Sequence, residues 1–244
     1  MEADVVAVVM DMVDMSTPDM TMAEFSREQV QAMRAAGETD FTKRSLSGLD
    51  LGGMDFRGVD LRWARLNGTI LRGADLRGAR LDLAWLLKAD LEGANLAGAS
   101  LFSSQMQGVN LRGADLSGAR IVANLTRADL SNARLVGADM SADMRNQSMG
   151  LMRVVLRSAI LDGANLAGAN LARADAEFCS FRAATLSNVN LSGALLGGAD
   201  LTGATVDGLQ LQETDLQSAR LLDLRGADAI IGLDQAKHLD DAFR

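Results

Sequence analysis

An apolar residue recurs at every fifth position through most of this sequence, a period that neither an α-helix nor an ordinary β-strand has. The first run begins at Phe41 and ends at Ile121. Two residues before most of these apolar positions lies a small residue, as at Ala74 and Ala79. Each five-residue unit therefore has two positions that we predict to face inward, the large apolar position i and the small position i−2.

The remaining positions of the unit indicate how the chain turns. Residues i−2, i−1 and i can form a three-residue extended piece whose side chains alternate in, out, in. Positions i+1 and i+2 are rich in Gly, Ser and Arg and are expected to turn the chain. Four such sides predict a coil of roughly 20 residues, stacked on the next coil at about 4.8 Å. Stacking buries an apolar column that no single unit could bury alone.

The units ADLRGARL (74–81), ADLEGANL (89–96), ADLSGARI (114–121) and GANLAGANL (163–171) resemble the pentapeptide-repeat family, whose pattern is A(D/N)LXX. The resemblance covers about three quarters of the chain. It implies an all-β solenoid, a right-handed quadrilateral β-helix of about eight to nine coils with short helical caps at both ends. It also implies that Asp or Asn at i−1 bonds to neighbouring backbone. Leucine-rich repeats and hexapeptide helices have other periods and fit less well.

Two changes of register interrupt the period. Leu125 follows Ile121 after four positions and Leu151 follows Met140 after eleven, after which the original phase returns. Residues 141–153 are therefore predicted to leave the coil as a bulge or short loop. In gyrase-protecting members of the pentapeptide-repeat family, loops that project from the coil matter for activity, so a functional loop is one interpretation. The simpler interpretation is an insertion that the fold tolerates.

The two ends of a β-solenoid need caps, because they would otherwise expose backbone groups and the apolar column. Residues 1–20 are predicted to be a flexible acidic tail, or alternatively a partner-binding peptide. Residues 21–40 read as a helical cap, opened by a capping box at Thr21–Glu24 and ended by Gly37. The β-helix is assigned to 41–223 and a carboxy-terminal cap to 224–244. Family members that act on gyrase often dimerise through this end, so a homodimer is the alternative to a plain cap.

The formal charge of −8 is located almost entirely in the amino-terminal segment. Residues 1–40 hold nine acidic and two basic residues, whereas residues 41–223 hold nineteen of each. The repeat region is therefore neutral as a whole, which disfavours direct nucleic-acid binding. The apparent lack of a secretory signal or a membrane-length apolar run makes the cytoplasm the expected location.

We expect no catalytic, cofactor or metal site, and therefore no enzyme. The one cysteine, Cys179, occupies an inward i−2 position and excludes an intramolecular disulfide. The one histidine, His238, lies in the terminal cap, and neither residue has an evident partner. Aspartates such as Asp75 and Asp90 are at i−1, where the repeat needs a small polar side chain for structure.

Several apolar residues occupy outward positions, where a solenoid should be polar. If the coil is square, they lie on two adjoining sides within about three coils and form a partner-binding patch flanked by basic residues. The patch consists of Trp63, Leu83, Trp85, Leu87 and Phe102, with Arg62, Arg65 and Lys88 around them. Alternatively, the amino-terminal helix or tail covers these side chains. Val155 and Ile160 form a second, weaker group beside the predicted loop.

Three functions are consistent with this pattern. The first is a rigid protein-binding module, a scaffold or adaptor that docks an unidentified protein through the patch. The second follows from the resemblance, since some pentapeptide-repeat proteins mimic duplex DNA, bind DNA gyrase or topoisomerase IV and protect it from inhibitors; that role needs rows of surface acid. The third is an accessory role in a type VI secretion system. It rests only on the resemblance of the segment FSREQVQAMRAAGETDFTKRSLSGLDLGGMDF (25–56) to that of pentapeptide proteins found with such systems.

Overall fold

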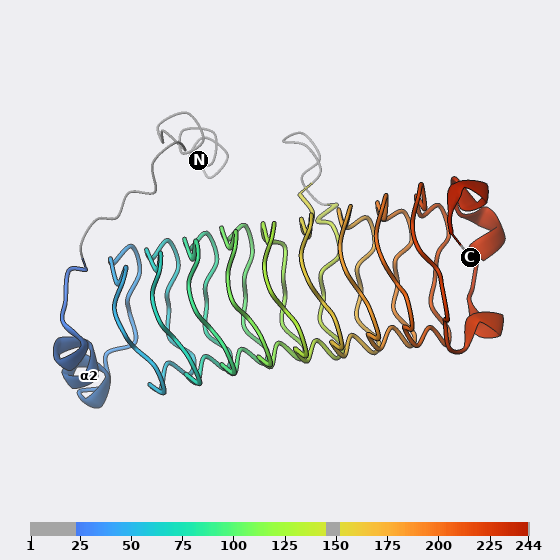
Figure 1. Ribbon diagram of the computed structural model, residues 1–244. Coiled ribbons are helices and arrows are strands. Elements are labelled where there is room, and N and C mark those ends of the chain that lie inside the picture. Colours follow the sequence, from blue (N-terminus) through green and yellow to red (C-terminus); the bar gives the residue numbers. More distant parts are fainter. Residues whose placement is uncertain (1–22, 145–151, 244) are drawn as a thin grey trace.

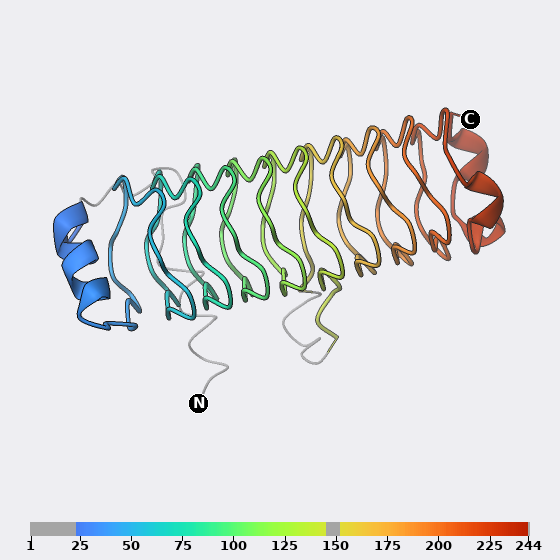
Figure 2. The same ribbon diagram turned by 90° about the horizontal axis from the view of Figure 1, so that it is seen from below.

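The chain winds into a rod of four-sided coils that stack along one axis (Figures 1 and 2). This computed structural model describes residues 23–144 and 152–243. Parallel bridges join residues 20 positions apart, as in Asp40–Asp60 and Arg65–Trp85. The predicted coil of 20 residues is therefore confirmed for the repeats up to Arg120.

Each side of a coil pairs with its neighbours through one residue, the outward residue at i−1. Asp60, for example, donates its N–H to the Thr39 carbonyl (2.9 Å) and accepts from the Phe41 N–H (2.8 Å). In the described ranges the extended structure consists of such single-residue bridges, without a longer strand. The predicted three-residue extended piece was therefore too long, because the corners take up the flanking residues.

We number the four sides by these bridging residues, in the order in which the chain meets them. Side 1 starts with Asp40, Asp60, Arg80 and Ser100, side 2 with Ser45, Arg65, Trp85 and Gln105, side 3 with Asp50, Ile70, Asp90 and Asn110, and side 4 with Asp55, Asp75, Asn95 and Asp115. A corner is named by the two sides that it joins, so that Arg62 and Trp63 form part of the 1–2 corner.

The interior is built from the two inward positions, as predicted. Leu91 at i and Ala94 at i−2 are both fully buried, and the same holds along the rod. Phe41 and Phe56 fill the amino-terminal end with an edge-to-face contact, their ring centroids 6.2 Å apart. The few hydroxyls inside bond to backbone, as Thr69 does to the Leu46 carbonyl at 2.8 Å.

The corners are tight turns that require left-handed backbone. At a typical corner the Met54 N–H donates to the Leu51 carbonyl, and Gly53 between them has φ +69°. A positive φ at the third residue is the mark of a type II turn, and glycine adopts it with the least strain. The frequent glycine at i+2 therefore follows from corner geometry. The side-chain oxygen of the bridging aspartate or asparagine also accepts from the corner N–H, as in Asp55 to Arg57 (3.0 Å).

Both changes of register are absorbed at the 1–2 corner. After Ile121 the corner lacks its left-handed residue, and Asn124 bridges to Gln105 and Val155. One coil later Ala142 keeps a regular corner bond to Ala172 (3.1 Å), and Asp143 forms an antiparallel bridge with Met152. The departure predicted for 141–153 is therefore located between Asp143 and Met152; residues 145–151 lie outside the described part of the chain.

The amino-terminal cap is helix α2 (Arg27–Ala35), which covers the first coil (Figure 1). Ser26 accepts from the Gln29 N–H, and the Gln29 side chain accepts from the Ser26 N–H, so this pair forms the capping box. The box predicted at Thr21–Glu24 was therefore misplaced. Val30 is buried against the end of the core, and Gly37 ends the helix with φ +85°. The predicted tail, 1–20, falls outside the described residues.

The carboxy-terminal cap is one more coil, with longer corners. Its bridging residues recur every six positions, at Arg225, Ile231, Lys237 and Phe243. The 3-10 helices η2 (Ala227–Ala229), η3 (Leu233–Gln235) and η4 (Leu239–Asp241) form three of its corners. Leu224, Ile230 and Ala236 pack against the core. The sixth residue widens each corner, so this coil closes the end of the rod instead of repeating it.

Candidate protein-binding surface

The predicted patch residues gather on side 2 and on the two corners that flank it. Trp63 and Leu83 are neighbours along the 1–2 corner, where the Trp63 N–H donates to the Asp82 carbonyl (3.1 Å) and the Leu83 N–H to the Phe102 carbonyl (2.8 Å). Trp85 is a bridging residue of side 2, which lies between the 1–2 corner and the 2–3 corner. The 2–3 corner holds Leu87. The structure therefore brings together the apolar residues that were predicted from the sequence to form the patch.

All five apolar members of the patch are half-buried. The most exposed large apolar side chains lie elsewhere, at Phe178 (66% exposed), Phe243 (58%) and Ile231 (48%). The patch is therefore a partly sheltered surface, where the prediction had described it as exposed.

The 1–2 corner differs from the other corners in its backbone chemistry. Over the first four coils its left-handed position holds Lys43, Trp63, Leu83 and Ser103, with φ between 56° and 63°. The 3–4 and 4–1 corners hold glycine in all four coils, at Gly53, Gly73, Gly93 and Gly113 and at Gly58, Gly78, Gly98 and Gly118. A side chain in the left-handed region costs roughly 1–2 kcal/mol. Strain of this kind is often found at functional sites, and here it places two large apolar side chains on one edge of the rod.

The basic residues predicted to flank the patch are placed around it. Arg62 pairs with Asp60 at 2.7 Å, and this contact lowers the pKa of the Asp60 carboxyl and raises that of the guanidinium. Arg65 is the neighbour of Trp85 on side 2, and Lys88 follows Leu87 in the 2–3 corner. Arg65 and Lys88 are exposed. Lys88 therefore adds a cation on the 2–3 corner, whereas the charge of Arg62 on the 1–2 corner is compensated by Asp60.

Side 2 also contains the side-chain oxygens whose hydrogen bonding is incomplete. In the described residues, five buried side-chain oxygens have no partner: those of Ser45, Ser47, Ser103, Gln107 and Asp175. Each belongs to side 2 or to one of its two corners. Buried polar atoms are satisfied in most proteins, so their concentration on one side distinguishes it from the other three. Sequence reasoning had no signal for this feature, because it depends on side-chain contacts between coils.

Charges on the other sides are largely paired. On side 3 each bridging aspartate forms an ion pair with an arginine: Asp50 with Arg27, Asp90 with Arg72, Asp129 with Arg112 and Asp200 with Arg182. On side 4, Asp55 and Asp75 pair with Arg57 and Arg77 at 2.6 Å. These carboxylates do not form an uncompensated acidic row.

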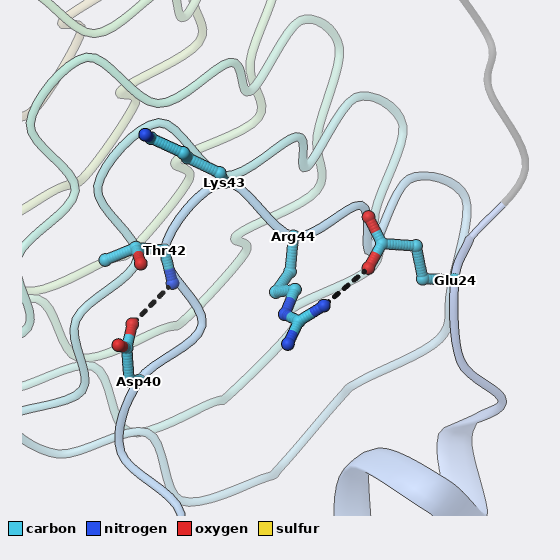
Figure 3. Close-up of a pocket in the computed structure, with 5 residues that line it drawn as sticks. All are labelled: Glu24, Asp40, Thr42, Lys43 and Arg44. Atoms are coloured by element: carbon cyan, nitrogen blue, oxygen red, sulfur yellow. Dashed lines mark hydrogen bonds and ion pairs between the residues drawn. The ribbon is translucent and has the colours of Figure 1, made fainter.

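A shallow hollow lies at the amino-terminal end of the 1–2 corner (Figure 3). It is lined by Glu24, Asp40, Thr42, Lys43 and Arg44. Glu24 pairs with Arg44 at 3.4 Å, and Asp40 accepts from the Thr42 N–H at 2.9 Å. The lining is polar and includes Lys43, the first left-handed residue of the 1–2 corner.

Cys179 and His238, the two residues considered for catalysis, are placed by the structure as follows. Cys179 is buried, and burial raises the pKa of its thiol well above the usual value. His238 does have a partner, contrary to the prediction, because its Nδ1 lies 2.8 Å from Asp215 Oδ1. Within the described ranges, no three His, Cys, Asp or Glu side chains are grouped as metal ligands.

Sequence reasoning overlooked Phe178. This residue holds the left-handed position of a 2–3 corner (φ +58°), and its ring lies over Gly198 of the next coil. An aromatic residue at i+2 was the available signal. The two residues of the weaker group are outward, as predicted, with Val155 half-buried and Ile160 42% exposed.

The sequence profile of pentapeptide repeats matches eight copies, within residues 38–73, 86–118, 123–142, 151–188 and 179–217. The chain therefore belongs to the pentapeptide-repeat family, and its fold is the right-handed quadrilateral β-helix of that family.

Three solved structures illustrate the likeness. HetL of the cyanobacterium Nostoc, described as involved in heterocyst differentiation regulation, is 28% identical over 90% of this chain and 95% of its own (TM-score 0.46). QnrB1, described as a plasmid-mediated fluoroquinolone resistance protein, is 18% identical over 75% of this chain and 92% of its own (TM-score 0.48). A thylakoid-lumen protein of Arabidopsis thaliana is 30% identical over 51% of this chain and 66% of its own (TM-score 0.28). A search of curated proteins gave no match. Among the described helices, none has the length and apolar character that crossing a membrane would require.

Proposed function

We propose that this protein is a non-catalytic, rod-shaped binding module that docks a protein partner on side 2. The observation that carries the proposal is the convergence of Trp63, Leu83 and Trp85 on one edge of a rod whose aspartates are otherwise largely paired. Tryptophan beside arginine is the usual composition of a protein-binding hot spot. The left-handed backbone at Trp63 and Leu83 supports the same conclusion, because a corner without a required side chain could use glycine, as the 3–4 and 4–1 corners do over the same four coils.

The neighbouring features make side 2 the most distinctive of the four sides. Ser103 and Gln107, whose side-chain oxygens lack a hydrogen-bond partner, lie in the two corners of side 2, one coil beyond Trp85. The register changes at Ile121 and Met140 alter the same 1–2 corner further along the rod. A partner that follows this edge would therefore meet apolar, basic and irregular surface in succession.

The alternative role of a DNA mimic that protects gyrase or topoisomerase IV has less support. Such a surface would need acids in rows, and the aspartates of side 3 are neutralised by arginines. A supercoiling assay with purified gyrase and a quinolone tests this role directly. Protection by the wild-type protein would favour the mimic over the docking module. The accessory role in secretion has no structural observation behind it, and a homodimer through the carboxy-terminal coil would rest on the exposed Ile231 and Phe243.

The test of the docking module is affinity capture from native lysate with three purified baits. They are the wild type, the Trp63→Asp/Trp85→Asp variant and the matched control Ile160→Asp/Ile231→Asp, which places two carboxylates at exposed apolar residues of sides 3 and 1. We expect one partner to be retained by the wild type and the control and to be lost from the double variant. Identical capture by all three baits, at equal melting temperatures, would contradict the proposal.

A further inference from the structure

The first described residues fix where the preceding segment joins the rod. The Glu24 N–H donates to the Ser45 carbonyl (2.9 Å), and the Ser45 N–H donates to Glu24 Oε1 (3.0 Å). Glu24 also pairs with Arg44. Residues 1–22, which lie outside the described part of the chain, therefore connect to the start of side 2, whose next bridging residues are Arg65 and Trp85.

Helix α2 leaves the patch uncovered, because it covers the end of the rod. Arg27 bonds to the Asp50 and Gly52 carbonyls, and Arg34 bonds to the Asp55 carbonyl. These contacts tie the helix to sides 3 and 4 and their corner. Residues 1–22 are therefore the segment of this chain best placed to cover the patch.

The composition of residues 1–22 is complementary to the patch. The segment contains five acidic residues and no lysine or arginine, and most of its other residues are Val, Met or Ala. Its acids are Glu2, Asp4, Asp11, Asp14 and Asp19. The patch offers apolar side chains between basic residues, and Lys43 adds a further cation between the junction and Trp63. Apolar residues interspersed with acids match this arrangement, whereas a basic segment would be repelled.

The distances permit the contact without strain. Twenty-two residues can span up to roughly 70 Å, whereas the patch lies within about three coils, or roughly 15 Å, of the junction. A tether of this length also raises the effective concentration of the segment to the millimolar range. Even a weak intrinsic affinity would therefore keep the patch occupied.

We propose that residues 1–22 dock on the side 2 patch of their own chain, so that a partner must displace them. The docking itself is independent of the proposed function, and only the competition with a partner rests on it. The acids of the segment would face Lys43, Arg65 and Lys88, and its valines and methionines would cover Trp63, Leu83 and Trp85.

Tryptophan fluorescence tests the docking in the full chain, because Trp63 and Trp85 are the only tryptophans and the protein contains no tyrosine. One variant carries Val5→Ser, Val6→Ser, Val8→Ser and Val9→Ser; a second carries Asp11→Lys, Asp14→Lys and Asp19→Lys. We expect both to shift the emission maximum to longer wavelength and to increase quenching by acrylamide. The matched control, Asp234→Lys with Asp240→Lys and Asp241→Lys, makes the same charge change in the far cap and should leave both readouts at wild-type values.

Unchanged emission and quenching in both segment variants would overturn the proposal. A wild-type signal that changes with protein concentration would also overturn it, because the segment would then dock on a second copy. Lysate capture separates this inference from the proposed function. Patch-dependent capture with unchanged fluorescence refutes only the docking of residues 1–22, whereas shifted fluorescence with capture that ignores the patch refutes only the proposed function.

Discussion

Arg65 and Trp85 are adjacent bridging residues on side 2, joined by a parallel bridge in which the Leu66 N–H donates to the Trp85 carbonyl at 2.7 Å. The fold therefore places an arginine and a tryptophan at adjacent outward positions, although they are 20 positions apart in sequence. The N–H and carbonyl of each residue are both bonded to the preceding coil, and the residues beside it are bonded to the following one. Their relative position is consequently a rigid property of the rod, which suits a preorganised binding surface.

The assignment of inward positions predicts that Leu91→Asp unfolds the rod locally or entirely. Leu91 is fully buried in the leucine column, and an unpaired carboxylate there should cost about 3–5 kcal/mol. Circular dichroism and urea denaturation measure the loss. The control Asn165→Asp introduces a carboxylate at an outward position, bridged to Arg134 and Thr185, and should fold normally. A Leu91→Asp protein with wild-type melting would refute the assignment.

The left-handed corners predict that two glycines respond differently to alanine. Gly203 has φ +70° with open space where a methyl group would be added, so Gly203→Ala should destabilise by about 1 kcal/mol through backbone strain alone. At Gly197, where φ lies outside the left-handed region, a methyl would make ordinary contacts at 3.7 and 3.8 Å. Gly197→Ala should therefore be neutral or slightly stabilising. Equal urea midpoints for the two variants would contradict this account of the corners.

The paired aspartates predict that stability falls in acid. The hydrogen bond from Arg57 lowers the pKa of the Asp55 carboxyl, and that from Arg62 lowers the pKa of Asp60. A depressed folded-state pKa stabilises the fold above the unfolded value of about 3.9, and this contribution is lost as pH falls through the folded value. Urea midpoints should therefore be constant near neutrality and should decrease below about pH 4. Asp60→Asn should reduce this dependence of the urea midpoint on pH. A wild-type urea midpoint that is the same at pH 3 as at pH 7 would contradict the prediction.

The burial of Cys179 predicts that its thiol is inert in the folded protein. Burial raises the thiol pKa, and the thiolate is the reactive form. A colorimetric disulfide reagent at pH 8 should therefore modify the native protein only at the rate of unfolding, and should modify one thiol at once in denaturant. Fast modification of the native protein would show that this part of the core opens. A Ser218→Cys variant, with the thiol in a corner, provides the exposed control.

The position of Trp85 predicts that its loss affects binding more than folding. Trp85→Asp removes a half-buried outward side chain and leaves the inward column intact. We therefore expect a wild-type circular dichroism spectrum together with loss of the captured partner. A collapse of the spectrum would show that Trp85 is a structural residue.

Much of the fold could be predicted because the repeat is local. The burial of Leu91, the inward position of Cys179 and the turn at each corner follow from the place of a residue within its own five-residue unit. The capping box was misplaced because two similar patterns lie five residues apart, and packing of Val30 against the first coil selects the one that begins at Ser26. The partner of His238 was missed because Asp215 reaches it from the preceding coil.

The sequence by itself determined the inward column and the set of outward apolar residues, because each depends on counting in fives, whereas the four sides of the coil were expected from the family resemblance. Only the tertiary structure decided that Trp63, the short repeat after Ile121 and the departure at Asp143 share the 1–2 corner. Their shared location depends on whether the missing residue after Ile121 and the extra residues after Asp143 change the length of a side or of a corner. The coil keeps its bridges by altering the corner, since a lost bridge would leave backbone groups unpaired, and this choice places the irregular features on one edge of the rod.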